Sequence, residues 1–96
     1  MKKFLLLYFG DEAPSPAVRD AWERWFAGVG DRIVDSGNPL GGCVEVTRSG
    51  RRDISPDDGA ATGYSIITAE SREEAERLLA DCPYVAGVRI HEALPM

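Results

Sequence analysis

The first segment of the chain, residues 2–9, is hydrophobic from Phe4 onward in both alternating sets of positions. Successive side chains of a strand point to opposite faces. One face would carry Phe4, Leu6 and Tyr8, and the other Leu5, Leu7 and Phe9. A strand that is apolar on both faces must be covered on both. Helices of this short chain can cover one face only, so the pattern predicts that a second copy covers the other.

The next segment, from Ser15 to about Ser36, has the spacing of an amphipathic helix. Ser15 suits the N-cap position, and Pro16 suits the first turn. Gly28 and Gly30 weaken the middle of this helix, so a kink or break there stays open. The apolar stripe, with its three- and four-residue spacings, consists of Val18, Trp22, Trp25, Phe26, Val29, Ile33 and Val34.

The second half of the chain is read as three further elements and one polar connection. Residues 40–49 alternate and predict a second strand, with Glu45 on one of its faces. The stretch 49–61 is rich in Gly, Pro and Asp, which is typical of a hairpin connection or a mobile loop. A third strand and a second helix follow over Gly63–Ala80. Residues 86–93 predict a fourth strand.

Gly63–Ala80 carries the clearest local signal, a strand that leads directly into a capped helix. Ser71 stands three residues before Glu74, which is the spacing of a capping box. Ala75, Leu78, Leu79 and Cys82 then recur at helical spacing and form one apolar stripe. Within the strand, Tyr64, Ile66 and Thr68 share one face, and Ser65 and Ile67 share the other. Both sets contain apolar residues, so either can face the helices.

The predicted order is β-α-β-β-α-β. This order is typical of the ferredoxin-like α+β arrangement, in which both helices cover one face of an antiparallel four-stranded sheet. Ninety-six residues suit a single domain, residues 1–96. The face without helices carries part of the apolar set of the first strand, so we expect a homodimer.

Composition narrows the range of partners. The formal net charge is −5, and an acidic surface repels phosphate backbones, so nucleic acid is not an expected partner. The basic cluster Arg48–Arg52 is interpreted as a solvated hairpin tip. The apolar run after Lys3 is six residues long, too short for a signal peptide or a membrane span. We expect a cytoplasmic protein without a membrane partner.

The cysteines and the histidine offer few metal ligands. Cys43 and Cys82 lack the spacing of a metal site, and His91 is the only histidine. The expectation is therefore no metal and no cofactor. Both cysteines fall in apolar contexts and are expected to be buried free thiols.

Several segments of the chain resemble one known family. They are Met1–Tyr8 followed by Gly10–Glu12, then Gly63–Ile67, Ser71–Ala75, Asp81–Pro83 and Ile90–Met96. Together, in this order and spacing, they are similar to YCII-related (DGPF-type) proteins. The resemblance covers nearly the whole chain. It implies a dimeric α+β barrel, in which two ferredoxin-like sheets pack face to face around a small cavity.

The resemblance implies less about chemistry. Some relatives use a His–Asp pair, and one branch degrades chlorinated aromatic compounds. The histidine that those relatives carry near the first strand has no counterpart among Leu5–Tyr8. The Asp-Gly-Pro-Phe signature is reduced to Asp58–Gly59, followed by Ala60 and Ala61. A catalytic His–Asp pair is therefore not carried over position by position.

His91 is the candidate for acid–base chemistry because it is the only imidazole. It should face away from the helices beside Arg89, at the cavity between subunits, where Glu45 can pair with either residue. The alternative is a histidine without a catalytic role, either partly exposed on the last strand or hydrogen-bonded at the dimer interface. The lack of a fixed carboxylate partner favours this alternative.

The remaining candidates are ligand-binding side chains: Tyr8 and Tyr64 through their hydroxyls, and Asp58 through its carboxylate. Each has a structural alternative, since the tyrosines can pack in the core and Asp58 can stabilise a turn. Trp22 and Trp25 can form a platform for an aromatic ligand, but their place in the helical stripe favours core packing.

Two functions follow as hypotheses. The first is a small enzyme or ligand-binding protein that acts on a small metabolite, such as an aromatic one, by acid–base chemistry. The second is a non-catalytic dimeric module with a structural or regulatory role. An open polar cavity would favour the first, and a fully packed interface would favour the second.

Overall fold

The structure, a computed structural model, describes residues 1–96 and is of the α+β class, as predicted. Its longer elements are strands β1 (Lys2–Phe9), β2 (Ile33–Asp35), β3 (Cys43–Thr47), β4 (Gly50–Ile54), β5 (Gly63–Ala69) and β6 (Gly87–Ala93), and helices α1 (Pro16–Val29) and α2 (Arg72–Leu78). Two 3-10 turns complete the chain, η1 (Gly30–Arg32) and η2 (Pro56–Asp58).

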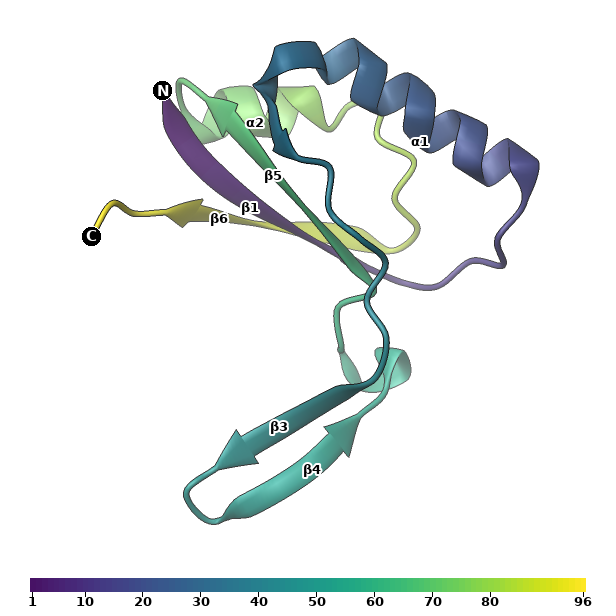
Figure 1. Cartoon of the computed structure of the whole chain (residues 1–96), viewed down its shortest axis with the longest axis vertical. Coiled ribbons are helices and arrows are strands. Elements are labelled where there is room, and N and C mark those ends of the chain that lie inside the picture. Colours follow the sequence, from purple (N-terminus) through teal and green to yellow (C-terminus); the bar gives the residue numbers. More distant parts are fainter.

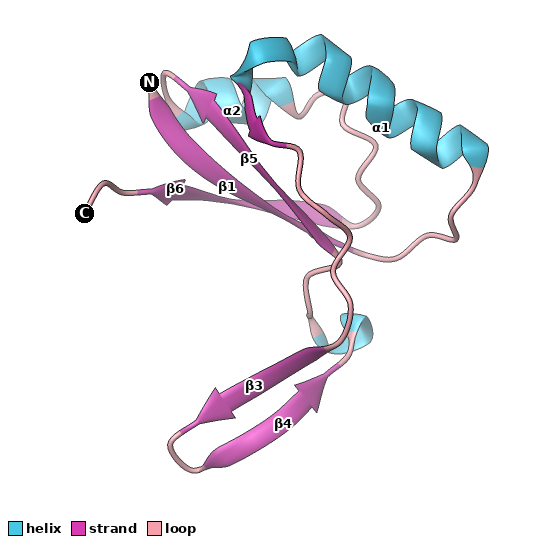
Figure 2. Ribbon diagram, viewed as in Figure 1, coloured by secondary structure: helices cyan, strands magenta, loops and turns pink.

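Four strands form the main sheet in the order β2-β5-β1-β6, and every neighbouring pair is antiparallel. Both helices lie on the same face of this sheet (Figure 1). The order is compatible with the ferredoxin-like arrangement. The other face of the sheet has no helix on it, and the β3–β4 hairpin projects away on that side (Figure 2).

The two faces of β1 divide as the alternation predicted. Phe4, Leu6 and Tyr8 are buried beneath the helices, where they form the centre of the core with Ile67 and Trp25. The opposite set, Leu5, Leu7 and Phe9, is only partly buried and lies on the open face. Burying the first set removes most of its apolar surface from water, which is the main stabilising contribution of a small core.

The faces of β5 and β6 are now assigned. On β5, Ser65 and Ile67 are buried toward the helices, whereas Tyr64 and Ile66 lie on the open face. This is the second of the two arrangements left open by the sequence. On β6, Val88 and Ile90 pack against the core, so Arg89 and His91 lie on the open face, as predicted.

The first helix is shorter than predicted, because it ends at Val29 instead of near Ser36. Gly30 caps it with φ 68° and ψ −130°, a conformation that glycine tolerates and other residues avoid. The β-branched residues Ile33 and Val34 then enter the sheet as β2, beside β5. The break that was left open at the two glycines therefore occurs.

The second strand of the sheet was assigned wrongly to residues 40–49. That place belongs to β2, and residues 43–47 form β3, which pairs only with β4 in a separate two-stranded sheet. The segment 49–61 was predicted to be either a hairpin connection or a mobile loop. It contains β4, which forms the hairpin with β3. Glu45 pairs with Arg52 across this hairpin, with Nε to Oε1 at 2.9 Å.

The start of α2 is capped as predicted, with one difference. Ser71 Oγ accepts the Glu74 amide at 3.1 Å, but the Glu74 carboxylate accepts the Glu70 amide rather than that of Ser71. Arg32 also donates to this carboxylate. The amide and the guanidinium together lower the pKa of Glu74 below its ordinary value. The Arg32 contact thus ties the start of α2 to η1.

The cysteines differ in their surroundings. Cys82 is buried against the core, and desolvation raises the pKa of its thiol to about 12. Cys43 lies on the hairpin and is only partly buried, so the expectation of two buried thiols is confirmed for Cys82 alone.

Candidate functional site

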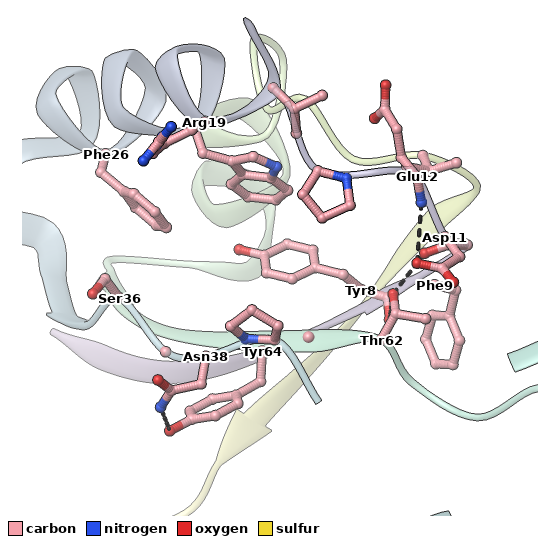
Figure 3. Close-up of a pocket in the computed structure, with 18 residues that line it drawn as sticks. Tyr8, Phe9, Asp11, Glu12, Arg19, Phe26, Ser36, Asn38, Thr62 and Tyr64 are labelled. Atoms are coloured by element: carbon pink, nitrogen blue, oxygen red, sulfur yellow. Dashed lines mark hydrogen bonds between the residues drawn. The ribbon is translucent and has the colours of Figure 1, made fainter. Parts of the chain in front are cut away.

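A cleft of about 460 Å³ opens between α1 and the end of the sheet where β1 finishes and β5 begins. Its upper wall is α1, its base is the last residues of β1, and its lower wall is the segment 36–39 that leads from β2 toward the hairpin (Figure 3). A volume of this size lies within the range of small-molecule sites in proteins.

The base of the cleft is Tyr8, which is 7 % exposed. Its hydroxyl donates to Ser65 Oγ at 2.8 Å, and Ser65 Oγ donates in turn to the Ser36 carbonyl at 2.8 Å. Burial raises the pKa of the Tyr8 phenol well above its usual range, and the Ser65 hydrogen bond offsets part of that rise. Tyr8 is therefore a neutral, fixed side chain whose ring forms a rigid base.

Aromatic side chains make the upper wall. The Trp22 ring lies edge-on to Tyr8, with centroids 4.9 Å apart and planes at 66°, and the Phe26 ring lies 5.8 Å from Trp22. Both geometries are within the favourable range for aromatic pairs. Trp22 and Phe26 also pack on the core, so their rings are held from behind and present a firm surface to the cleft.

The sequence left two roles open for the tryptophans, core packing and a platform for an aromatic ligand. Trp25 is buried in the core, and its indole N–H donates to the Leu78 carbonyl at 2.8 Å. Trp22 packs on the core but also lines the cleft. Core packing is thus confirmed for both, and Trp22 has an additional face that a ligand can reach.

Charged side chains stand at opposite ends of the cleft (Figure 3). Arg19 lies beside Phe26 at one end, and Asp11 and Glu12 lie at the other, with Tyr8 between them. Asp11 Oδ1 accepts the Glu12 amide at 3.1 Å, which fixes the loop after β1. The Arg19 guanidinium makes no ion pair within the chain; the cations that do are Lys2, Arg32, Arg51, Arg52 and Arg72.

Polar groups hold the lower wall in place. Asn38 Nδ2 donates to the Tyr64 hydroxyl at 3.3 Å, and the Tyr64 amide donates to the Asn38 carbonyl at 3.3 Å. Gly37 has φ 84°, and a Cβ there would meet the Tyr64 carbonyl oxygen at 1.6 Å. The close passage of this segment over β5 therefore requires glycine.

Of the predicted ligand-binding residues, Tyr8 forms the base of the cleft, whereas Tyr64 borders its lower wall with a side chain that lies on the open face of β5. Arg89 and His91 do not line the cleft, because they lie on the open face of the sheet, opposite Leu7 and Leu5 in the register of β1 and β6. Arg89 stacks over the Phe9 ring at 4.6 Å. His91 is exposed.

Glu45 and Asp58 lie outside both the cleft and the open face of the main sheet. The predicted proximity of Glu45 to Arg89 and His91 required a shared sheet, and Glu45 belongs to the separate hairpin sheet instead. Asp58 accepts a hydrogen bond from Ser55 Oγ at 3.1 Å within η2. This contact agrees with the turn-stabilising alternative for Asp58.

Sequence reasoning did not single out Arg19. It is one of the arginines in the predicted helix, and no local motif distinguishes it from Arg24. Asp11 and Glu12 closely follow the predicted first strand in the sequence. Their common cleft depends on how α1 crosses the sheet, which helical spacing alone does not fix.

No group of three or more His, Cys, Asp or Glu side chains is placed to share a metal ion. Neither helix has the length and apolar character needed to cross a membrane. Comparison of the chain with protein-family models, with curated proteins and with solved structures found no match.

Proposed function

We propose that this protein binds a small, planar and largely apolar molecule in the cleft beneath α1. The observation that carries the proposal is the cleft itself, about 460 Å³ with aromatic walls held rigidly from the core. Mostly apolar clefts with a few convergent polar groups are the usual form of small-molecule sites. Rigid walls favour binding because little conformational entropy is lost when the ligand enters.

We further propose that the protein works as a homodimer and belongs to the YCII-like dimeric α+β barrels. Leu5, Leu7 and Ile66 on the open face are only partly buried within one chain, which supports a covering layer. The hairpin projects on the same side and exposes Val44 and Val46, the latter at 74 %. A second copy seated against the open face is the occupant that this pattern favours.

A second candidate function places acid–base chemistry on the open face. Its supporting observation is that His91 and Arg89 occupy adjacent same-face positions of β6, beside the apolar residues of β1. In a dimer these residues would border the cavity between the two sheets, where the histidine would move a proton and the arginine would orient an anionic or phenolic oxygen.

The ligand-binding function is tested with 2-naphthol as a planar probe, by isothermal titration calorimetry. We expect saturable binding with one site per chain. Val18→Phe, on the cleft-lining side of α1, should fill the cleft and weaken binding by about tenfold or more, the scale on which one misplaced side chain changes affinity. Ala27→Phe, which adds the same ring at an exposed position of α1, is the control and should bind like the wild type.

Absence of saturable binding by the wild-type protein would contradict the proposal, and so would equal affinities of the two phenylalanine variants. His91→Ala separates the two candidate functions. We expect it to leave 2-naphthol binding unchanged, whereas loss of binding in that variant would move the site to the open face.

A further inference from the structure

The cleft has electrostatic polarity along its length. Figure 3 shows Arg19 at one end, Asp11 and Glu12 at the other, and the ring of Tyr8 between them. The ends are separated by aromatic surface that carries no charge. A ligand that fits this arrangement presents an apolar middle and two different polar ends.

The cationic end has unused hydrogen-bonding capacity. The Arg19 guanidinium forms no ion pair, although Glu23 lies one turn further along α1, and no acceptor of the chain binds it. A guanidinium has five N–H donors in a planar fork that matches the two oxygens of a carboxylate. The side chain is exposed at the rim, so it can approach a ligand without first breaking a contact.

The acidic end has unused acceptors. Asp11 uses Oδ1 for the Glu12 amide, which leaves its second carboxylate oxygen without a partner in the chain, and the Glu12 carboxylate forms no hydrogen bond or ion pair. Ionised carboxylates accept hydrogen bonds and repel other anions. A ligand with two acidic ends is therefore disfavoured, and one whose far end donates a hydrogen bond is favoured.

We infer that the ligand of the α1 cleft is an aromatic carboxylate with a hydroxyl or amino group at its opposite end. Its carboxylate lies at Arg19, its rings lie against Trp22 and Tyr8, and its donor group lies at Asp11 and Glu12. This inference rests on the proposed ligand-binding function and specifies the chemical class that the site selects.

Three naphthalene probes test the inference by calorimetry: 2-naphthol, 2-naphthoate and 6-hydroxy-2-naphthoate. We expect 6-hydroxy-2-naphthoate to bind about fivefold more tightly than 2-naphthol, the scale of one solvent-exposed ion pair. Arg19→Gln should remove this difference without changing the affinity for 2-naphthol. Arg24→Gln, an exposed arginine of the same helix outside the cleft, should leave the difference intact.

The opposite end is tested by the ratio of affinities for 6-hydroxy-2-naphthoate and 2-naphthoate. We expect a ratio of about three to five in the wild type, and near one when Asp11→Asn and Glu12→Gln are combined. Equal affinities for 6-hydroxy-2-naphthoate and 2-naphthol would overturn the inference. A carboxylate preference that survives Arg19→Gln, or a hydroxyl preference that survives the double variant, would also overturn it. If 2-naphthol itself fails to bind, the ligand-binding function fails and this inference fails with it. If 2-naphthol binds but the preferences are absent, only the inference on ligand class fails.

Discussion

Tyr8 belongs to both the hydrophobic core and the cleft, so its hydroxyl is the clearest single-residue link between stability and binding. The ring packs among core residues, while the hydroxyl joins Ser65 and the Ser36 carbonyl in one hydrogen-bonded chain. Tyr64 offers a natural comparison. Its hydroxyl has only two long contacts, at 3.3 Å to Asn38 and 3.4 Å to Asp35, near the surface.

Tyr8→Phe should lower the free energy of unfolding by about 1 kcal/mol, because the buried Ser65 oxygen loses its donor. Tyr64→Phe should change it by less than about 0.5 kcal/mol. Urea unfolding of both variants measures the difference. Equal effects of the two substitutions would show that the buried chain of hydroxyls contributes nothing specific.

Glu74 makes stability depend on acid pH. Its pKa is lowered below the ordinary value of 4.5, first by the Glu70 amide and then by Arg32. The stabilisation from its charged form is therefore fully present above about pH 4.5 and is lost as the pH falls through the lowered pKa of the folded state. Glu74→Gln should lack this contribution at every pH.

The measurement is urea unfolding of the wild type and Glu74→Gln between about pH 6 and pH 3. We expect the difference in free energy of unfolding to be constant in the upper part of this range and to shrink toward its acid end. Glu76→Gln, whose carboxylate contacts only the exposed Arg72, is the matched control on the same helix. A difference that grows as the pH falls would contradict the assigned role of Glu74.

At the scale of elements, the sequence predicted the strands and helices that are specified locally. Strand β1, the capped start of α2 and strand β6 follow from alternation and capping, and each occurs within a few residues of its predicted bounds. The end of α1 was harder to predict. Ile33 and Val34 continue the helical spacing, yet they are also good strand residues, and the choice depends on pairing with β5.

The assignment of β3 failed for a related reason. Residues 40–49 alternate well enough for a sheet strand, but alternation does not indicate which strand will be the partner. The main sheet already has β2 beside β5, so β3 pairs with β4 instead. The candidate site was affected in the same way, because Arg19, Asp11 and Tyr64 border one cleft only through tertiary packing.

The two glycines near the end of α1 should respond oppositely to alanine. Gly28 lies inside the helix with open space around its Cβ position, so Gly28→Ala should raise the free energy of unfolding by about 0.5–1 kcal/mol. Gly30 has φ 68°, so Gly30→Ala should lower it by about 1–2 kcal/mol. Thermal or urea unfolding decides the signs. Two changes of the same sign would contradict the described end of α1.

At the scale of the whole molecule, one chain leaves an apolar sheet face and an extended hairpin uncovered. A two-stranded hairpin is only marginally stable by itself in water, and β3–β4 projects away from the helices (Figure 1). The proposed dimer would cover both surfaces. It would also place Arg89 and His91 at the interface instead of in solvent.

The dimer is tested by sedimentation velocity at micromolar concentration. We expect the wild type to sediment as a dimer and Leu7→Glu, which places a charge on the open face, to sediment as a monomer. Ala27→Glu, which adds the same charge on the exposed side of α1, should remain a dimer. A monomeric wild type would contradict the interpretation of the open face.

The central claim, that ligands bind beneath α1, is tested most directly by the two indole N–H resonances in a nitrogen–proton correlation spectrum. The Trp25 N–H is bound to the Leu78 carbonyl inside the core, whereas Trp22 lines the cleft. Trp22→Phe assigns the two signals. On titration with 6-hydroxy-2-naphthoate, we predict that the Trp22 signal shifts in proportion to occupancy and that the Trp25 signal moves much less. An unchanged Trp22 signal, with shifts confined to His91 and its neighbours on β6, would contradict the account.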